Sequence, residues 1–332
     1  ITTQDLGLYS FDFLVPSATS LGTHNIEVLF QGSYYYITSD NNVNSEILST
    51  TSFEFSEIEV FRNQEFFLSS HLFDDLSNPM VNEHVNVTFN GKKYHLITDS
   101  EGFVEQNITL LPTQKLGNYI AKWEYLGFNY YLPSSAEQEV RVLASTNIQL
   151  YSDSEVIVGE TFTFNGTLRD DMGNPLDAVL SFSFDGNIIE TIESDSNGYF
   201  ENTYLVPNES IAGPNTIMIT YIPDEFYLSS TSSWVLKVSH NIRIEMPDYD
   251  AMTNSTEEIS GFVFDKANRP VSNLEVRLSL DSGFPLIGKT NAEGKFSIDL
   301  EIPFGTSLGY HNLTVESLGN NYYIGNSTTS KL

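Results

Sequence analysis

Apolar and polar residues alternate along most of the chain, in runs of about five to eight residues separated by short polar turns. One run places Val85, Val87 and Phe89 on one side of the backbone, with Asn86 and Thr88 on the other. Alternation with period two is the pattern of a β-strand that buries one face. No long stretch shows the apolar spacing of an amphipathic helix. The pattern therefore predicts an all-β protein.

The same strands and turns recur at intervals of 95 or 96 residues. The first landmark is a turn of the form Asp-x-x-x-Asn/Arg-Pro, and the second is a hairpin of the form Asp/Asn-x-x-Gly. The prolines are Pro79, Pro175 and Pro270, and the glycines are Gly102, Gly198 and Gly294, with an earlier copy at Gly7. A glycine that recurs in a hairpin commonly has a positive φ, so we expect these glycines to share that conformation.

Two further landmarks complete each repeat: a loop that runs from a proline to a glycine, and a closing aromatic pair. The loops are 16–22, 112–117, 207–213 and 303–309, and the pairs are Tyr35–Tyr36, Tyr130–Tyr131, Phe226–Tyr227 and Tyr322–Tyr323. The order of the landmarks predicts four segments. Residues 1–48 form the C-terminal half of a domain, and residues 49–143, 144–238 and 239–332 form full repeats.

Short strands with frequent turns are typical of a β-sandwich, and about seven strands fit into each repeat. In the strand before the first landmark a small residue recurs, as Ser70, Gly166 and Gly261. We expect it where the opposing sheet approaches closely. The joints between repeats are short and rich in Ser and Thr, so they cannot act as long flexible tethers. Neighbouring domains should therefore stack closely.

The four landmarks resemble those of the immunoglobulin-like repeat domains in bacterial and archaeal cell-surface proteins. The closing segments that begin at Phe30 and Tyr221 add to the resemblance. It implies tandem immunoglobulin-like antiparallel β-sandwiches in an elongated rod. It also implies an extracellular spacer, an adhesin stalk, or a component of a wall, filament or S-layer. The family supplies no catalytic residues.

The composition limits the classes of molecule that the protein can bind. The chain has 15 basic and 44 acidic residues, a net charge of −29, which argues against nucleic acid and anionic membranes as partners. The same charge permits cations, of which calcium is the usual choice of acidic oxygen ligands. Cysteine is absent, so an inter-sheet disulfide is excluded. No apolar run approaches the roughly 20 residues of a membrane-spanning helix.

Residues that could carry chemistry are few. The six histidines form no HExxH pair, and no nucleophile elbow, phosphate-binding loop or dinucleotide motif is present, so we expect no enzyme and no cofactor. One hairpin places oxygen-bearing side chains at Glu193, Asp195 and Asn197 before Gly198. This spacing makes them weak candidates for a calcium loop, and a plain turn is the favoured interpretation.

Seven Asn-x-Ser/Thr sequons are candidates for N-glycosylation. They are Asn86, Asn107, Asn165, Asn208, Asn254, Asn312 and Asn326. Asn86 alternates with Val85 and Val87, which predicts that it points away from the core. We expect a glycan on at least one such outward asparagine if the source glycosylates its secreted proteins.

The half repeat has an apolar face without a partner sheet of its own. Two expected strands carry this face, at Tyr9, Phe11, Phe13 and Val15, and at Ile26, Val28 and Phe30. Burying a large apolar side chain contributes about 1.5–3 kcal/mol, so exposing seven forfeits on the order of 10 kcal/mol. We expect cover from a chain that continues upstream of residue 1, or from a neighbouring subunit by strand complementation.

Three functions remain open on the sequence. The first is an extracellular structural protein that self-associates into a filament or S-layer or forms a stalk. The second is an adhesin or ligand-binding module with a specific site on the loops of one domain. The third is the non-catalytic region of a large secreted enzyme.

Overall fold

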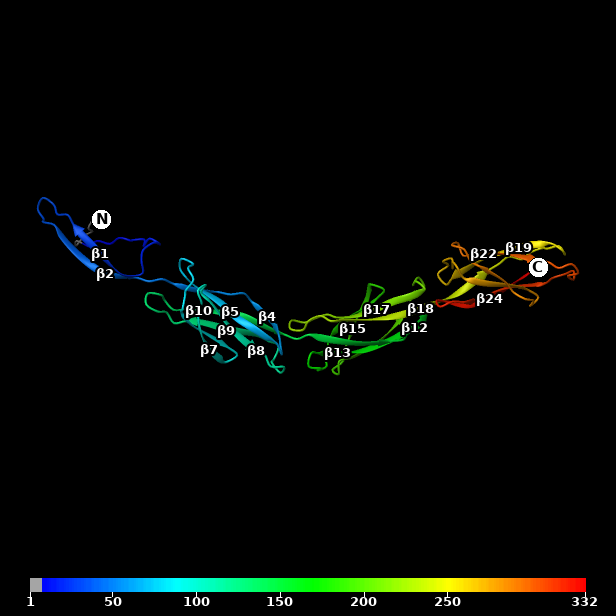
Figure 1. The fold of residues 1–332 in the computed structure, drawn as a ribbon, viewed down its shortest axis with the longest axis horizontal. Coiled ribbons are helices and arrows are strands. Elements are labelled where there is room, and N and C mark those ends of the chain that lie inside the picture. Colours follow the sequence, from blue (N-terminus) through cyan, green and yellow to red (C-terminus); the bar gives the residue numbers. More distant parts are fainter. Residues whose placement is uncertain (1–7) are drawn as a thin grey trace. The chain divides into compact units, whose positions relative to one another are not determined.

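A computed structural model describes residues 8–332, and every regular element in that range is a β-strand (Figure 1). This confirms the all-β class. The chain divides into two compact units, Ile1–Ala144 and Ser145–Leu332, which we describe separately. Gly7, expected to match the hairpin glycines, lies outside the described residues.

The first unit begins with a two-stranded antiparallel hairpin. Its strands are β1 (Gly22–Phe30) and β2 (Ser39–Ile47). Residues 8–21 form no strand before β1, so the strand expected from Tyr9 to Val15 is wrong. In the full repeats the equivalent strand pairs with the strand before the first landmark, and residues 8–48 contain no such strand. A strand needs a neighbour to pair with, and the described part of the half repeat does not offer one at this position.

The apolar face of the half repeat is open. Phe11, Phe13 and Ile26 are 48%, 69% and 39% exposed, and they line a cleft of about 620 Å³. Val28 is half-buried. Among residues 8–332, the three clusters of buried apolar side chains include no residue before Val60. As expected, this segment encloses no core by itself.

The first sandwich follows in the same unit. Its strands are β3 (Thr51–Glu54), β4 (Ile58–Phe61), β5 (Glu65–Asp74), β6 (His84–Phe89), β7 (Lys92–Ile97), β8 (Phe103–Thr109), β9 (Gly117–Tyr125) and β10 (Ser134–Leu143). One sheet has the order β3-β5-β8 and the other the order β4-β10-β9-β6-β7. All neighbours are antiparallel except β4 and β10, the early and the last strand, which run parallel.

The second sandwich, in the second unit, repeats this arrangement. Its strands are β11 (Thr146–Ser152), β12 (Glu155–Ile157), β13 (Thr161–Asp170), β14 (Val179–Phe184), β15 (Asn187–Glu193), β16 (Tyr199–Leu205), β17 (Gly213–Tyr221) and the first part of β18 (Thr231–Glu245). The sheets are β11-β13-β16 and β15-β14-β17-β18, with β12 parallel to β18. Eight strands stand where about seven were expected, because the first strand is split between the two sheets.

The third sandwich begins inside β18. Its other strands are β19 (Thr256–Asp265), β20 (Glu275–Leu280), β21 (Leu286–Lys289), β22 (Lys295–Glu301), β23 (Asn312–Gly319) and β24 (Tyr323–Lys331). The end of β18 pairs with β19 and β19 with β22, while β24, β23, β20 and β21 form the second sheet. Two antiparallel sheets joined in this order are the immunoglobulin-like arrangement.

Each sandwich has its own core between its two sheets. The alternating trios expected from the sequence contribute to all three cores; Val85, Val87 and Phe89 are buried in the first, and only Leu280 of the third repeat's trio is half-buried. There the indole of Trp123 is fully buried and donates from Nε1 to Oε1 of Gln138 at 3.0 Å. Burial of one face of each strand stabilises the domains without disulfides.

Both turn landmarks are explained by one device. In the first turn, Oδ1 of Asp170 accepts from the backbone N–H of Met172 and Asn174, at 2.9 and 2.8 Å, and Oδ2 accepts from Nδ2 of Asn174. The equivalent aspartates, Asp74 and Asp265, accept the same pair of backbone bonds. A carboxylate that replaces backbone acceptors in this way fixes a turn.

In the hairpin landmark the side chain three residues before the glycine accepts two backbone N–H bonds in the same way, as Asp99, Asp195 and Asn291 do. Gly102, Gly198 and Gly294 have φ of 72°, 73° and 71°, which confirms the shared left-handed conformation. Glycine reaches this region without the steric cost that other residues incur.

The small residue of the strand before the first turn has a different cause from the one expected. A Cβ on Gly166 would lie 2.5 Å from the ring of Phe200 and 2.1 Å from the carbonyl oxygen of Gln149. Both neighbours lie on strands paired with β13 in its own sheet, so the close approach is lateral. Gly261 stands in the same relation to Phe296.

Candidate functional site: the joints between sandwiches

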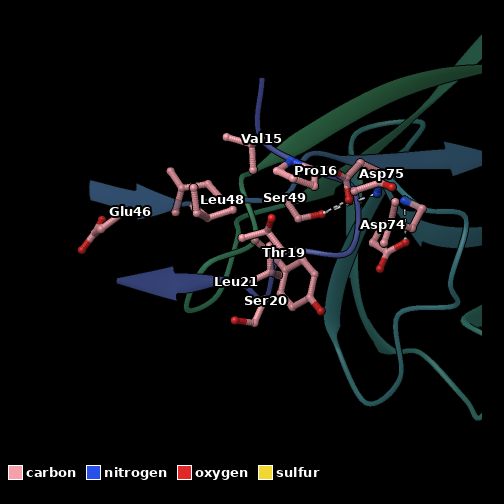
Figure 2. A pocket seen from close by; sticks show the side chains of 14 residues that line it. Val15, Pro16, Thr19, Ser20, Leu21, Glu46, Leu48, Ser49, Asp74 and Asp75 are labelled. Atoms are coloured by element: carbon pink, nitrogen blue, oxygen red, sulfur yellow. Dashed lines mark hydrogen bonds between the residues drawn. The ribbon is translucent and has the colours of Figure 1, made fainter. Parts of the chain in front are cut away.

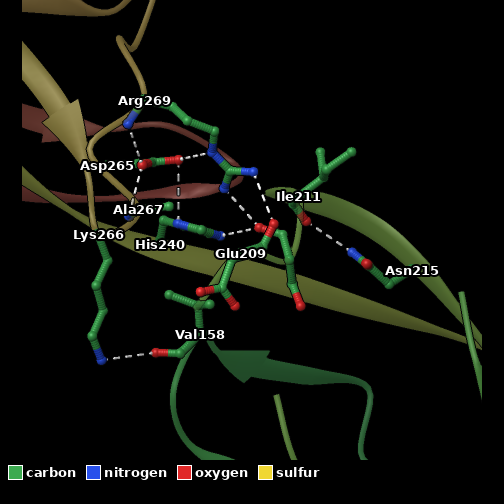
Figure 3. A network of polar contacts seen from close by, with 10 residues as sticks. Val158, Glu209, Ile211, Asn215, His240, Asp265, Lys266, Ala267 and Arg269 are labelled. Atoms are coloured by element: carbon green, nitrogen blue, oxygen red, sulfur yellow. Dashed lines mark hydrogen bonds and ion pairs between the residues drawn. The ribbon is translucent and has the colours of Figure 1, made fainter. Parts of the chain in front are cut away.

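The joint in the second unit is built on one continuous strand. The 15 residues of β18 close the second sandwich by pairing with β17 and open the third by pairing with β19. No loop separates the two sandwiches. The side chain of Arg269, in the turn after β19, then reaches back to the loop 207–213 of the second sandwich (Figure 3).

Asp265 is the anchor of this joint. It is 3% exposed, and its Oδ2 accepts from Nε of Arg269 at 2.8 Å. The guanidinium therefore occupies the place that an asparagine amide holds in the other two repeats. Because a buried carboxylate needs a cationic or hydrogen-bonding partner, Arg269 is held by the turn and not free in solvent.

The same guanidinium binds the neighbouring sandwich. Nη1 of Arg269 donates to the carbonyl oxygen of Glu209 at 3.0 Å, and Nη2 donates to that of Ser210 at 2.7 Å. Lys266 adds a bond of 3.2 Å from Nζ to the carbonyl oxygen of Val158. Planar, multidentate hydrogen bonding of this kind fixes geometry as well as distance. The joint is therefore specified by side chains and does not depend on β18 alone.

His240 lies at the centre of the network and is fully buried. Its Nε2 lies 3.0 Å from the carbonyl oxygen of Ser210, and its Nδ1 lies 3.5 Å from Oδ2 of Asp265 (Figure 3). Burial lowers the pKa of the ring; Asp265 opposes that shift, and Arg269 and Lys266 add to it.

The joint in the first unit uses the same elements with other side chains. The loop 16–22 faces the turn at Asp74 and Asp75 across a cavity of about 610 Å³, which Tyr131 also lines (Figure 2). Ser49 takes the place of His240 and donates from Oγ to Oδ1 of Asp75 at 2.7 Å. Neither Ser49 nor its equivalent Ala144 titrates, so the histidine distinguishes the joint in the second unit.

The calcium candidates lie in the hairpin that follows β15. Oδ1 of Asp195 accepts from the backbone N–H of Asn197 and Tyr199, both at 2.8 Å, and these bonds lower its pKa, that of Tyr199 most. Glu193 is the last residue of β15 and is exposed. In the part of the chain that the structure describes, no group of three His, Asp or Glu side chains is arranged to hold a metal ion. The arrangement is that of a turn.

The seven sequons are spread over the sandwiches. Asn107, Asn208, Asn254, Asn312 and Asn326 are exposed, while Asn86 and Asn165 are half-buried on the outer side of their strands. A glycan would be attached to Nδ2 of the asparagine. In Asn326 this atom donates a hydrogen bond to the carbonyl oxygen of Ile242. Asn107 is exposed on a regular strand, between Gln106 and buried Ile108. Use of these sites stays a prediction.

Sequence reasoning missed the joint residues His240, Asp265, Lys266 and Arg269 as a group. The turn landmark marked the aspartate and the Asn/Arg position, but as turn residues only. Their partners in the second sandwich are the backbone carbonyl groups of Val158, Glu209 and Ser210, which leave no signature in the side chains.

No family model and no curated protein matches the chain. Among solved structures, it is similar to a tetra-tandem repeat from the extending region of a large adhesion protein, with 16% identity over 95% of this chain and 82% of the other, at a TM-score of 0.40. The chain is also similar to an I-band fragment of titin, with 11% identity over 86% of this chain and 97% of the fragment, at a TM-score of 0.42. A third similar structure is a calcium-stabilised, ice-binding adhesin from an Antarctic bacterium, with 12% identity over 93% of this chain and 80% of the other, at a TM-score of 0.28.

All three TM-scores lie below 0.5, so the assignment of the fold rests on the strands and cores described above. The chain is a tandem array of immunoglobulin-like β-sandwiches. Within residues 8–332, no helix is long and apolar enough to cross a membrane.

Proposed function

We propose that the chain is an extracellular structural protein, a spacer segment of a surface filament, S-layer or stalk, and that it has no catalytic role. The observation that carries the proposal is β18, which belongs to two sandwiches at once. A binding module on a flexible tether has no need of a strand shared between domains. A segment that sets a distance does need one, because a shared strand leaves no linker to extend.

The strand pairing within each sandwich supports a load-bearing role. In the first sandwich the early strand β4 pairs in parallel with the last strand β10, from Ile58↔Val140 to Phe61↔Leu143. In the second, β12 pairs in parallel with β18. Tension applied to the two ends of such a domain acts along these strands, so their hydrogen bonds resist together in shear instead of opening one at a time.

Self-association is the partnership that we propose for this role. The net charge of −29 opposes close side-by-side packing at low ionic strength, because like charges repel over about a Debye length. Assembly should therefore become stronger as salt or divalent cations are added. A specific nucleic-acid partner is not part of the proposal.

Imaging of the native cell surface tests the function directly. An antibody against the exposed turn 281–285 is used to label intact cells for electron tomography. We expect label at regular spacing along a filament, lattice or stalk. Label confined to the cell interior, or recovery of the protein only as free monomer in the medium, would contradict a structural role at the surface.

An adhesin is the second candidate, and the tip of the third sandwich favours it. The turn between β20 and β21 has five residues, whereas the equivalent turns are Asn90–Gly91 and Asp185–Gly186. Its Phe284 is 100% exposed. An ion pair between Asp281 and His311 joins this turn to the loop that carries Phe304, Leu308 and Tyr310, which are 89%, 94% and 86% exposed.

Exposed apolar groups that gather on neighbouring loops mark interaction surfaces. Beads coated with the chain or with a Phe284→Ala/Phe304→Ala/Tyr310→Ala variant are compared for retention on intact cells of the source. The adhesin function predicts that the variant loses retention, while Tyr151→Ala, an exposed aromatic on β11, retains it. Equal retention of all three would remove the adhesin function.

A further inference from the structure

The joint in the second unit contains a titratable group in a place where the other repeats have none. His240, Ser49 and Ala144 are equivalent, since each lies two residues before the residue that pairs with the turn aspartate: Ile242↔Asp265, Thr51↔Asp74 and Thr146↔Asp170. All three are buried, at 0%, 1% and 0% exposure. The position requires burial, and only here does it bury a side chain that titrates near neutral pH.

The groups that face His240 come from both sandwiches. Asp265, Lys266 and Arg269 belong to the turn after β19, and the ring of Tyr323 on β24 lies 6.4 Å away, centroid to centroid. The loop 207–213 contributes the carbonyl oxygen of Ser210 and, through Arg269, that of Glu209. The ring of His240 is therefore surrounded by one carboxylate, that of Asp265, and by two cations, those of Lys266 and Arg269.

Burial and the two neighbouring cations disfavour the protonated ring, and together they outweigh Asp265 and the hydrogen bond to the carbonyl oxygen of Ser210, which favour it. A neutral imidazole that donates from Nε2 to Ser210 keeps Nδ1 as an acceptor, and Nδ1 makes no hydrogen bond. Protonation would place a further cation close to Arg269, whose Nε already donates to Oδ2 of Asp265 at 2.8 Å. A buried charge that is not fully paired is costly, so the closed joint disfavours the protonated ring.

We propose that this joint is an acid-sensitive hinge, closed while His240 is neutral and released when His240 is protonated. In the released state β18 still connects the two sandwiches, but the contacts of His240 and Arg269 with the loop 207–213 are lost. The imidazolium then reaches water. The third sandwich gains freedom to move relative to the second, while both remain folded.

The direction with pH follows from linkage. Burial lowers the pKa of His240 in the closed joint from the ordinary value of 6.5, which the ring regains on release. The contribution of the neutral ring is fully present above pH 6.5 and is lost as the pH falls through 6.5 toward the lowered pKa. Between pH 7.5 and pH 5 the ratio of released to closed joint rises by at most about thirtyfold.

Pulsed electron resonance on the full chain measures this freedom. The sequence has no cysteine, so Asn187→Cys and Lys289→Cys place one spin label on each sandwich, both at exposed sites outside the joint. The distance distribution is recorded at pH 7.5 and pH 5, in the wild-type background and with His240→Gln. Glutamine does not titrate and retains an N–H that can donate to Ser210. Circular dichroism at both pH values checks that the sandwiches remain folded.

The hinge predicts a distribution that broadens at pH 5 with His240 and stays unchanged with His240→Gln. An unchanged distribution with His240 overturns the proposal, and so does equal broadening in both backgrounds, which would assign the effect to carboxylates. A second measurement does not depend on the variant's folding. NMR titration of the six histidines in the wild-type chain should show His240 titrating below 6.5, and titration at or above that value would also overturn the hinge.

Discussion

At the scale of single residues, the repeats differ at pairs of positions that face each other on neighbouring strands, and the two residues of each pair change together. Gly166 and Gly261 each lie beneath a phenylalanine ring of the neighbouring strand, whereas Ser70 is paired with Val104. The larger side chain on one strand goes with the smaller on the other. The small residue was visible in the sequence, but its cause was not, because strand register is needed to identify the residue beside it.

Gly166→Ser should destabilise the second sandwich by about 1–3 kcal/mol, the usual range for overpacking a core. A Cβ there meets the ring of Phe200 and a backbone carbonyl. Adding Phe200→Val copies the pair of the first repeat. Chemical denaturation of the two single variants and the double variant should therefore give a double whose loss is smaller than the sum. Strict additivity would show that the two positions do not interact.

The turn hypothesis for Asp195 has its own test. Asn291 fills the equivalent place in the third repeat and accepts the same two backbone bonds, so Asp195→Asn should leave the thermal midpoint of the second sandwich unchanged. Asp195→Ala should lower it, because two backbone donors lose their acceptor. Each variant is melted in calcium and in EDTA. A midpoint that rises with calcium only when Asp195 is present would establish the calcium loop instead.

At the scale of elements, alternation of apolar residues was sufficient for the strands but not for the joints. Val85, Val87 and Phe89 are buried as expected, because burial of one face is what the period of two reports. The strand expected at Tyr9–Val15 is absent, because pairing needs a neighbour that periodicity does not supply. The joint escaped prediction for a related reason: His240 and Arg269 bind backbone carbonyl groups, which every residue possesses.

Arg269→Asn separates the two tasks of the arginine. Asparagine at this position caps the turn in the other repeats, so the third sandwich should retain its stability. The bonds to Glu209 and Ser210 are lost, so amide hydrogen exchange in the loop 207–213 should accelerate. Arg269→Ala is the comparison, and it should cost the third sandwich about 1–3 kcal/mol because buried Asp265 loses a donor. Unchanged exchange in Arg269→Asn would show that the cross-joint bonds contribute little.

At the scale of the whole molecule, one structural plan is repeated. Each sandwich has its own core, its own pair of capped turns and a parallel contact between an early and a late strand, which in the third is between β18 and β24. The division at residues 49–143, 144–238 and 239–332 remains our proposal, together with the function as a load-bearing spacer. Both require that each repeat resists force as an independent unit.

Stretching single molecules of the full chain by its two ends measures that requirement directly. Three independent sandwiches predict three abrupt unfolding events that each lengthen the chain by roughly 300 Å, since about 95 residues extend by nearly 3.6 Å each, less the folded length. Residues 1–48, which enclose no core, should lengthen without a comparable event. Fewer events, unequal increments, or extension without abrupt unfolding would contradict an array of independent load-bearing domains.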